Sequence, residues 1–288
     1  MKSNLISSSD KMCFLQIRHD IIQGFLRNRR KYLILIAFLL ITYISFQNEM
    51  LNLSTAGFIQ GKPGFLDFIM YIAQGMREYI PESDEPFVIP FAWLSINLLL
   101  AYIIGDYATR DLYEFGTQMI LRAKKKKYWL TGKIIYCFGC TLSVYFFQVA
   151  VAYLFSALNG NYNIFISEQI WQIYFGVDPC SFSPFEIVNL IFILPFLTSF
   201  VLSLMQLLGT LIFKPIYSFL VVTIYLISSA YWKSYFLIGN YSMFLRNDKL
   251  SSDGLNAMMC LSILLILCLV LVISIGLVFK KHDIIEKN

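Results

Sequence analysis

Only a few residues of this chain have the types and spacing that chemistry requires. Cys137 and Cys140 form a C-x-x-C motif, which elsewhere can hold a metal or exchange disulfides. Here the pair lies inside an apolar run with no second pair and no histidine nearby, so we interpret both as packing residues. The two histidines, His19 and His282, lie near the ends of the chain and form no H-E-x-x-H motif. The sequence therefore predicts no catalytic residue, no metal site and no cofactor in this chain.

Polar side chains within the apolar runs are a second set of candidates. All of them are neutral, whereas ion-coupled carriers usually place charged residues inside the membrane, which argues against a carrier or a passive channel. Such residues commonly form hydrogen bonds between helices, and the alternative is a polar patch on a translocation path. They are Asn97, Gln148, Asn189 and Gln206.

A nucleotide-hydrolysis motif of the form G-x-x-x-x-G-K-[ST] does not occur in the sequence. If the chain transports a cargo, we therefore expect a partner protein to supply the energy.

The composition is typical of a membrane protein. Of 288 residues, 58% are hydrophobic and 14% are charged, and the mean hydropathy is +0.64, whereas soluble domains carry about 25% charged residues. Each span needs roughly 20 apolar residues. Lys214-Pro215 divides a long apolar stretch into two such runs. The prediction is an all-α membrane protein in which residues 1–288 form one transmembrane domain with six spans, at about 32–48, 88–107, 134–158, 187–213, 216–232 and 257–279.

The basic residues predict the orientation of the spans. Lys and Arg concentrate in residues 1–31, 106–133 and 280–288, and are sparse in the segments that alternate with these. Because basic segments stay on the cytoplasmic side, we expect both termini to be cytoplasmic and residues 48–87 to form a long external loop. The net charge of +5 then reflects topology, and no aromatic and basic groove predicts nucleic-acid binding.

Two segments outside the spans have amphipathic helical patterns. In residues 11–31, apolar side chains from Phe14 to Phe25 share one face and polar side chains, including Gln16 and Asp20, share another; this is typical of a helix lying in the membrane interface. In residues 106–133, Leu112, Phe115 and Met119 form an apolar stripe beside acidic residues. The second segment also carries Arg110, Arg122, Lys124–Lys127 and Lys133.

The external loop contains its own apolar piece, residues 65–76, which is preceded by Pro63-Gly64. Twelve residues are too few to span a bilayer. We therefore expect this piece either to dip into the outer interface or to cap the bundle from outside.

These features together resemble the permease subunit of an ABC-2-type ABC transporter. The segment before the first span is similar to the family's elbow helix. The segment Tyr113–Lys133 has a glycine, a glutamine, an arginine, a lysine run and an aromatic residue before the third span, as small permeases of this type often do. The external segment Gly239–Arg246 and the basic ending Gly276–Asp283 also match the order of features in the family. The first external loop is longer than in the family's better-known members.

The resemblance implies a half-transporter in a bacterial plasma membrane. Two permease copies, identical or different, would pair within the lipid bilayer, and two separate ATPase subunits would bind ATP-Mg and dock from the cytoplasm. The loop at 106–133 would contain the coupling helix; its alternative is to lie on the lipid surface. The residues implied at the ATPase-coupling interface are Asp111, Leu112, Glu114, Phe115, Met119 and Arg122.

The expected function is ATP-driven export of, or resistance to, an antimicrobial or amphipathic peptide. A lipid or a hydrophobic small molecule is the alternative cargo. A different class of function also fits the same features: a non-transporting sensor or scaffold that binds a cytoplasmic partner through the basic loop. Association with an ATPase distinguishes the exporter from the sensor or scaffold.

Overall fold

The computed structural model describes residues 8–81, 86–105, 107–112, 116–117, 126–161, 166–251 and 253–281. All regular elements in these ranges are helices, which confirms the predicted all-α class. Five described helical stretches are long and apolar enough to cross a membrane, and a sixth apolar helix, α10 (Pro215–Tyr231), is shorter. The five are Phe14–Thr55, Phe91–Asp111, Lys127–Leu158, Pro184–Ile212 and Ala257–Lys281.

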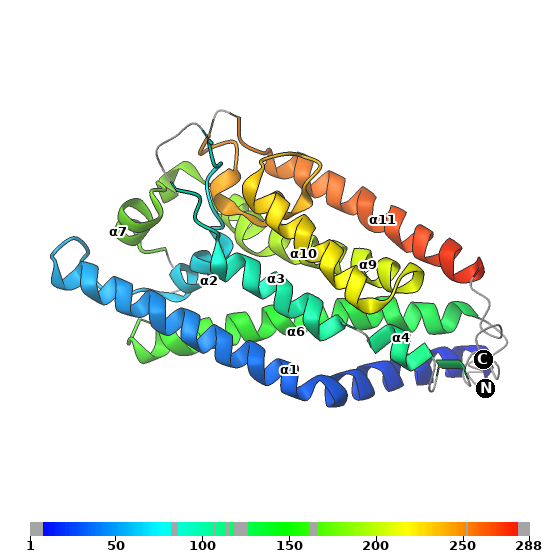
Figure 1. The fold of residues 1–288 in the computed structure, drawn as a ribbon. Coiled ribbons are helices and arrows are strands. Elements are labelled where there is room, and N and C mark those ends of the chain that lie inside the picture. Colours follow the sequence, from blue (N-terminus) through cyan, green and yellow to red (C-terminus); the bar gives the residue numbers. More distant parts are fainter. Residues whose placement is uncertain are drawn as a thin grey trace, which may run out of the picture.

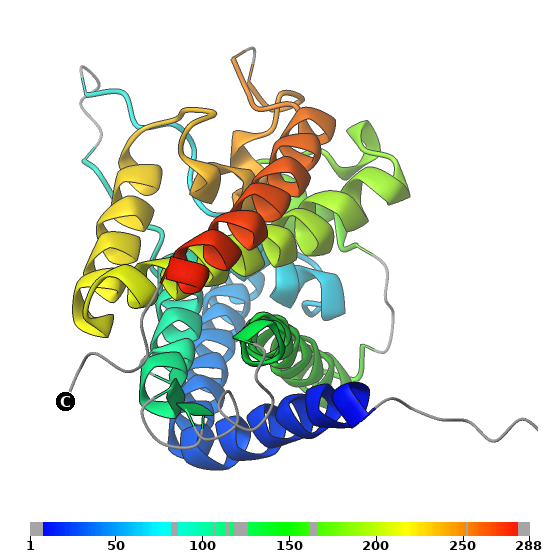
Figure 2. The same ribbon diagram turned by 90° about the vertical axis from the view of Figure 1, so that its right-hand side faces the viewer.

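Helix α1 (Ser8–Thr55) is too long to be a single membrane crossing. Its 48 residues would extend about 72 Å at 1.5 Å per residue, more than twice the ~30 Å hydrocarbon core. Figure 2 shows the first part of α1 running across one end of the bundle, while the rest recedes among the other helices. Part of α1 therefore lies outside the apolar layer.

The long helices run in alternating directions between two ends of the bundle (Figure 1). α1 begins and α11 (Ala257–Lys281) ends at the same end, which we call the terminal end; we call the other the loop end. α3 (Phe91–Ile104) returns to the terminal end, α6 (Lys126–Leu158) leaves it, and α9 (Leu194–Ile212) returns. α10 leaves again after a break at Lys214, as the sequence predicts.

Three boundaries differ from the predicted ones. α1 continues beyond residue 48 to Thr55, because Gln47 Nε2 donates a 2.8 Å hydrogen bond to Asn159 Oδ1 and Tyr174 hydrogen-bonds Glu49. α6 begins at Lys126 rather than 134, so the last residues of the predicted loop are helical. α3 ends at Ile104, where Gly105 adopts a φ of +39° that favours glycine.

The fourth crossing, after α1, α3 and α6, contains a change of helical type. α8 (Pro184–Val188), the π-helical η4 (Asn189–Ile193) and α9 follow one another without interruption. Pro195 lies in the first turn of α9 and has no backbone N–H. A wider π turn just before a proline accommodates the missing hydrogen bond within a continuous helix.

The apolar piece of the long loop packs into the protein. It forms α2 (Phe65–Ala73), most of whose residues are buried. The ring of Phe68 lies 5.3 Å from that of Tyr43, 5.4 Å from that of Phe46 and 5.6 Å from that of Phe155. α2 therefore joins α1 and α6 in an aromatic cluster toward the loop end.

Short helices complete the loop end. Three follow α6 and two follow α10. The buried ring of Phe244 in η6 contacts the buried rings of Trp171 in η2 and of Phe182, which follows η3. The short helices are α7 (Glu168–Ile170), η2 (Trp171–Phe175), η3 (Pro179–Ser181), η5 (Ile238–Ser242) and η6 (Phe244–Arg246).

Large apolar side chains remain exposed on the outside of the bundle. On α11 they include Leu265, Leu269 and Ile273, and on α10 they include Leu220 and Ile224. Exposed apolar surface of this extent is typical of helices that face lipid or another membrane subunit. Together with the apolar lengths of the helices, it indicates a multi-pass membrane protein.

Candidate functional site

A buried ion cluster lies at the terminal end, where three segments meet. Lys133 Nζ, from α6, is 2.5 Å from Asp20 Oδ1 of α1 and 2.6 Å from Asp111 Oδ2 of α4 (Tyr107–Asp111). All three residues are at most 2% exposed. We call these residues, together with His19, the terminal-end cluster.

Neighbouring side chains satisfy the carboxylates and surround the ammonium group. Tyr107 donates to Asp20 Oδ1 at 3.1 Å, and Trp129 Nε1 donates to Asp111 Oδ2 at 2.8 Å. Lys133 Nζ also lies 4.5 Å from the ring centroid of Tyr107 and 5.2 Å from that of Trp129, within cation–π range. A buried ion pair persists only with such complete pairing, so these contacts hold the three segments in one arrangement.

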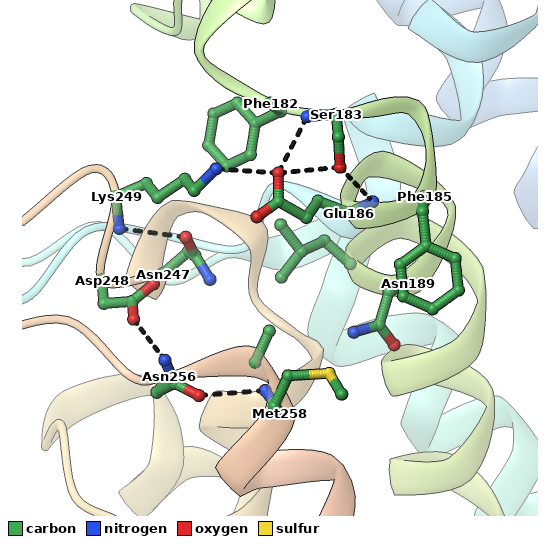
Figure 3. Close-up of a pocket in the computed structure, with 12 residues that line it drawn as sticks. Phe182, Ser183, Phe185, Glu186, Asn189, Asn247, Asp248, Lys249, Asn256 and Met258 are labelled. Carbon is green, nitrogen blue, oxygen red and sulfur yellow. Dashed lines mark hydrogen bonds and ion pairs between the residues drawn. The ribbon is translucent and has the colours of Figure 1, made fainter.

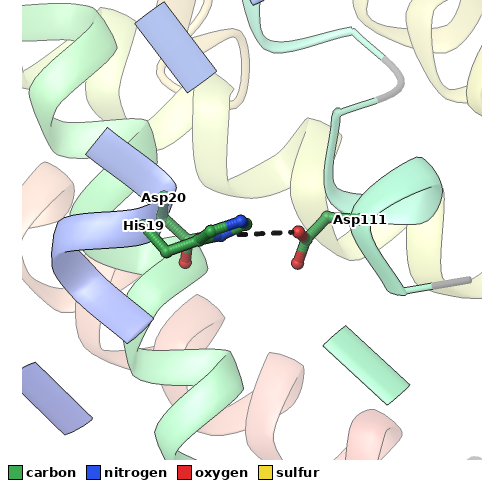
Figure 4. A group of neighbouring side chains, drawn as sticks. All are labelled: His19, Asp20 and Asp111. Carbon is green, nitrogen blue, oxygen red and sulfur yellow. Dashed lines mark ion pairs between the residues drawn. The ribbon is translucent and has the colours of Figure 1, made fainter. Parts of the chain in front are cut away.

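His19 lies beside both carboxylates (Figure 4). Its Nδ1 is 3.8 Å from Asp20 Oδ1 and 3.9 Å from Asp111 Oδ1. These three residues place potential metal-ligand atoms within 4.8 Å of one another. The ammonium group of Lys133 already contacts both carboxylates, and a divalent cation there would face its positive charge at close range. The arrangement is that of a structural ion cluster with an imidazole at its edge.

Two glycines allow α1 and α6 to approach closely at the cluster. A Cβ on Gly132 would lie 2.4 Å from Asp20 Oδ2, and a Cβ on Gly24 would lie 2.2 Å from the ring of Tyr136. Small residues at such positions let membrane helices approach closely, and here they leave room for side chains of the facing helix. Beside this contact, Asn28 Nδ2 donates to Tyr136 at 2.7 Å.

The predicted coupling residues divide into two groups. Asp111 and Leu112 are buried within the chain, at 2% and 5% exposure, so these two side chains are not on a surface that a partner could contact directly. This corrects their predicted position, and the physical reason is the ion pair of Asp111 with Lys133. Glu114, Phe115, Met119 and Arg122 lie outside the described residues.

The four predicted polar residues do not form one patch. Asn97 and Gln206 line the same small space between α3 and α9, where Ser199 donates to Asn97 Oδ1 at 2.8 Å and Gln206 Nε2 donates to Ala101 O at 2.9 Å. These are hydrogen bonds between helices. Gln148 lies elsewhere, on α6, where its backbone carbonyl accepts a 3.4 Å hydrogen bond from Tyr43.

Asn189 lines a pocket of about 360 Å³ at the loop end (Figure 3). Lys249 Nζ lies 2.8 Å from Glu186 Oε2 in this pocket, and the same carboxylate accepts from the Ser183 backbone N–H at 2.8 Å. Ser183 Oγ accepts from the Glu186 N–H in turn, which caps the start of α8. These contacts connect the segment after α10 to α8, at the start of the fourth crossing.

The loop end contains a buried carboxyl without a cationic partner in the described contacts. Asp67 of α2 is fully buried and accepts from Gly64 N at 2.7 Å, Ser167 Oγ at 2.6 Å and Trp171 Nε1 at 2.9 Å. Burial raises the pKa of Asp67, and the hydrogen bonds from Ser167, Gly64 and Trp171 oppose this increase. Asp67 thereby joins α2 to α7 and η2.

Arg246 is also buried, and it caps the C-terminal end of α10. Its guanidinium donates to Ser229 O at 2.5 Å, Ala230 O at 2.6 Å and Trp232 O at 3.2 Å, and it also bonds Asn240. The carbonyls at a helix C-terminus lack intrahelical partners and carry partial negative charge, so a cation there is stabilising. Burial lowers the pKa of Arg246 to about 10, partly offset by Glu78, and the group remains charged at neutral pH.

Sequence reasoning missed the role of Lys133 and Asp20. The sequence predicts Lys133 to be one of several topology-determining cations and Asp20 to be part of a polar face, yet both are buried against each other. Only Lys133 offers a signal, because it is an isolated charge between Gly132 and the apolar run that begins at Ile134, whereas Asp20 directly follows Arg18 and His19.

Fold and packing define an all-helical protein with several candidate membrane-spanning helices. The sequence matches the family described as "Protein of unknown function (DUF2705)" over residues 33–285, and the chain belongs to this family. No curated protein and no solved structure matches the sequence.

Proposed function

We propose that this chain is the membrane-spanning permease subunit of an ATP-driven exporter of the ABC-2 type, and that a separate ATPase subunit supplies the energy. The observation that carries the proposal is the terminal-end cluster. An ATPase outside the membrane can move the spans only if the loop that it contacts is rigidly connected to them. The cluster provides such a connection, because α4 is fixed to both α1 and α6 through Lys133.

The first part of α1 supports the predicted elbow helix. Gln16 and Asp20 face inward, and the Gln16 Nε2 to Asp20 Oδ2 hydrogen bond is 3.0 Å. Phe14 and Ile21 face outward, with Phe14 68% exposed. Arg18, Gln23 and Arg27 are also exposed. A helix whose outer surface combines apolar with basic side chains is suited to lie in the membrane interface.

The coupling surface is then the part of the loop that follows Leu112. In this proposal Asp111 and Leu112 anchor the loop, and the apolar stripe that continues through Phe115 and Met119 contacts the ATPase, with Glu114 and Arg122 beside it. We assign the terminal end to the cytoplasm of a bacterial cell because the basic segments belong to it. In this proposal α10 is the fifth of the six spans, shortened by the caps at its two ends.

The cargo that we propose is an antimicrobial or amphipathic peptide, with a lipid or a hydrophobic small molecule as the alternative. A cavity of about 640 Å³ toward the loop end supports an amphipathic cargo. It lies between α1, α2 and α3 and combines aromatic with polar side chains, including Tyr71, Trp93, Thr42 and Gln74.

The test is recruitment of the ATPase by matched variants. Phe115→Asp should reduce co-purification of the ATPase at least about tenfold, since a buried apolar contact would acquire a charge. The control is Phe58→Asp, which places the same change on an exposed side chain in the loop after α1. Equal recruitment by Phe115→Asp and wild type would contradict the coupling assignment, and the absence of any ATPase would favour a sensor or scaffold.

A further inference from the structure

The loop-end pocket at the start of the fourth crossing contains a buried amide without a hydrogen-bond partner for its oxygen. Asn189 lines this pocket, is 2% exposed, and extends from η4 into the space between the lining segments (Figure 3). Its Oδ1 receives no hydrogen bond. An unpaired buried acceptor is costly, so a residue of this kind beside a pocket indicates a ligand that supplies the donor. Asn189 also begins a π turn, and such turns inside helices frequently lie at functional sites.

Two carboxylates line the same pocket, and each has one oxygen that receives no hydrogen bond from the described residues. Glu186 uses Oε2 for its contacts with Lys249 and Ser183, which leaves Oε1. Asp248 accepts from Asn256 Nδ2 at 2.8 Å through Oδ2, which leaves Oδ1. Lys249 neutralises Glu186, whereas Asp248 forms no ion pair with a described residue. The described residues of the lining therefore retain one negative charge.

The volume and the charge of the pocket determine the class of ligand that fits it. A volume of about 360 Å³ falls within the usual range for organic ligands, roughly 300–1,000 Å³. A calcium ion needs about six to eight oxygen ligands and would face the ammonium group of Lys249. The charge of Asp248 would repel an anion. A primary ammonium group has one positive charge and three N–H donors, which match the oxygens of Asn189, Glu186 and Asp248.

Apolar side chains complete the lining, and among them Phe185 and Met258 are 63% and 58% exposed. We propose that this pocket binds a soluble amphipathic amine, with its ammonium group at the three oxygens and its apolar body against Phe185 and Met258. The ethanolamine headgroup of a phospholipid carries the same ammonium group, but it would bring a phosphate close to both carboxylates, which disfavours it. This inference concerns the chain by itself and is independent of the exporter function.

The test is fluorine NMR of para-fluorobenzylamine added to the full chain in phosphatidylcholine discs, which contain no primary amine. The ligand control is para-fluorobenzyl alcohol, which has the same ring without the charge. The test variant is Asp248→Asn, and its control is Asp253→Asn, which removes the same charge from an exposed residue outside the lining. A second test variant, Asn189→Leu, keeps most of the side-chain volume and decides the result if Asp248→Asn lowers the unfolding midpoint.

Wild type and Asp253→Asn should bind the amine more tightly than the alcohol. Asp248→Asn should weaken amine binding about tenfold or more and Asn189→Leu about threefold or more, because the first variant removes a charged acceptor and the second a neutral one. Amine binding by Asp248→Asn equal to that by Asp253→Asn, or by Asn189→Leu equal to that by wild type, would overturn the proposal. Loss of amine binding in discs that contain phosphatidylethanolamine would overturn the assignment to a soluble amine, because the lipid headgroup would then occupy the pocket.

Discussion

Lys133 lies between two buried carboxylates and is the only described lysine that contacts both. Replacing it with methionine would keep most of the side-chain volume and leave Asp20 and Asp111 facing each other without a cation. Removal of one partner from a buried ion pair typically costs about 3–5 kcal/mol. We therefore expect Lys133→Met to lower the thermal unfolding midpoint strongly in a fixed detergent.

The control for this substitution is Lys127→Met, on the exposed surface of the same helix, which should change stability by less than about 0.5 kcal/mol. Adding Asp20→Asn to Lys133→Met should restore part of the loss, because one uncompensated charge is removed. Equal midpoints for Lys133→Met and Lys127→Met would show that the cluster does not hold the three segments together.

The buried carboxyl of Asp67 should make the stability of the folded chain depend on pH. Because burial raises its pKa, the folded chain binds the Asp67 proton more tightly than the unfolded chain does. The contribution of this carboxyl to stability is therefore greatest at acidic pH and declines as the pH rises through the pKa of the folded state. Asp67→Asn should flatten this part of the curve of unfolding midpoint against pH.

Asp253→Asn, at an exposed position, is the control for the pH measurement and should leave the shape of the curve unchanged. A wild-type curve parallel to that of Asp67→Asn between pH 4 and 7 would refute the assignment to Asp67.

At the scale of elements, the contact between α1 and α6 can be tested with two glycines of one helix. Gly132→Ala would place a Cβ 2.4 Å from Asp20 Oδ2, whereas Gly139→Ala would place one in open space. Overpacking of this kind costs about 1–3 kcal/mol. We expect Gly132→Ala to lower the unfolding midpoint and Gly139→Ala to leave it unchanged or slightly higher, and the reverse order would contradict the close approach.

The hydrogen bonds of the Arg246 guanidinium should stabilise the C-terminal end of α10. Arg246→Met would leave the carbonyls of Ser229, Ala230 and Trp232 without these donors, at a cost of about 3 kcal/mol. Hydrogen exchange of residues 226–232 should become faster, while that of α11 changes less. Arg77→Met, which removes an exposed hydrogen bond to Gly176 O, should leave exchange in residues 226–232 unchanged.

Much of the fold could be predicted from the sequence, because the length of each apolar run and the basic residues between the runs determine where a helix begins and ends. Lys214-Pro215 ends one helix and begins the next, as predicted. The extension of α1 to Thr55 could not be predicted, because it depends on contacts of Gln47 and Glu49 with residues more than a hundred positions away. The same is true of Lys133 and Asp20, whose pairing requires knowledge of how α1 meets α6.

At the scale of the whole molecule, the terminal end and the loop end are built differently. The terminal end fixes its segments through ions buried between α1, α4 and α6. The loop end uses aromatic clusters, together with Asp67 and Arg246, to hold α2 and the short helices. Under the proposed function, force enters at the first of these ends and cargo leaves at the second.

The most direct test of the exporter proposal is affinity purification of the tagged chain from its native membranes in a mild detergent, with mass spectrometry of the proteins that accompany it. The proposal predicts a soluble ATPase with a nucleotide-binding P-loop, in a ratio near one to one with the permease chains. A homo-oligomer of this chain without any ATPase would contradict the exporter proposal.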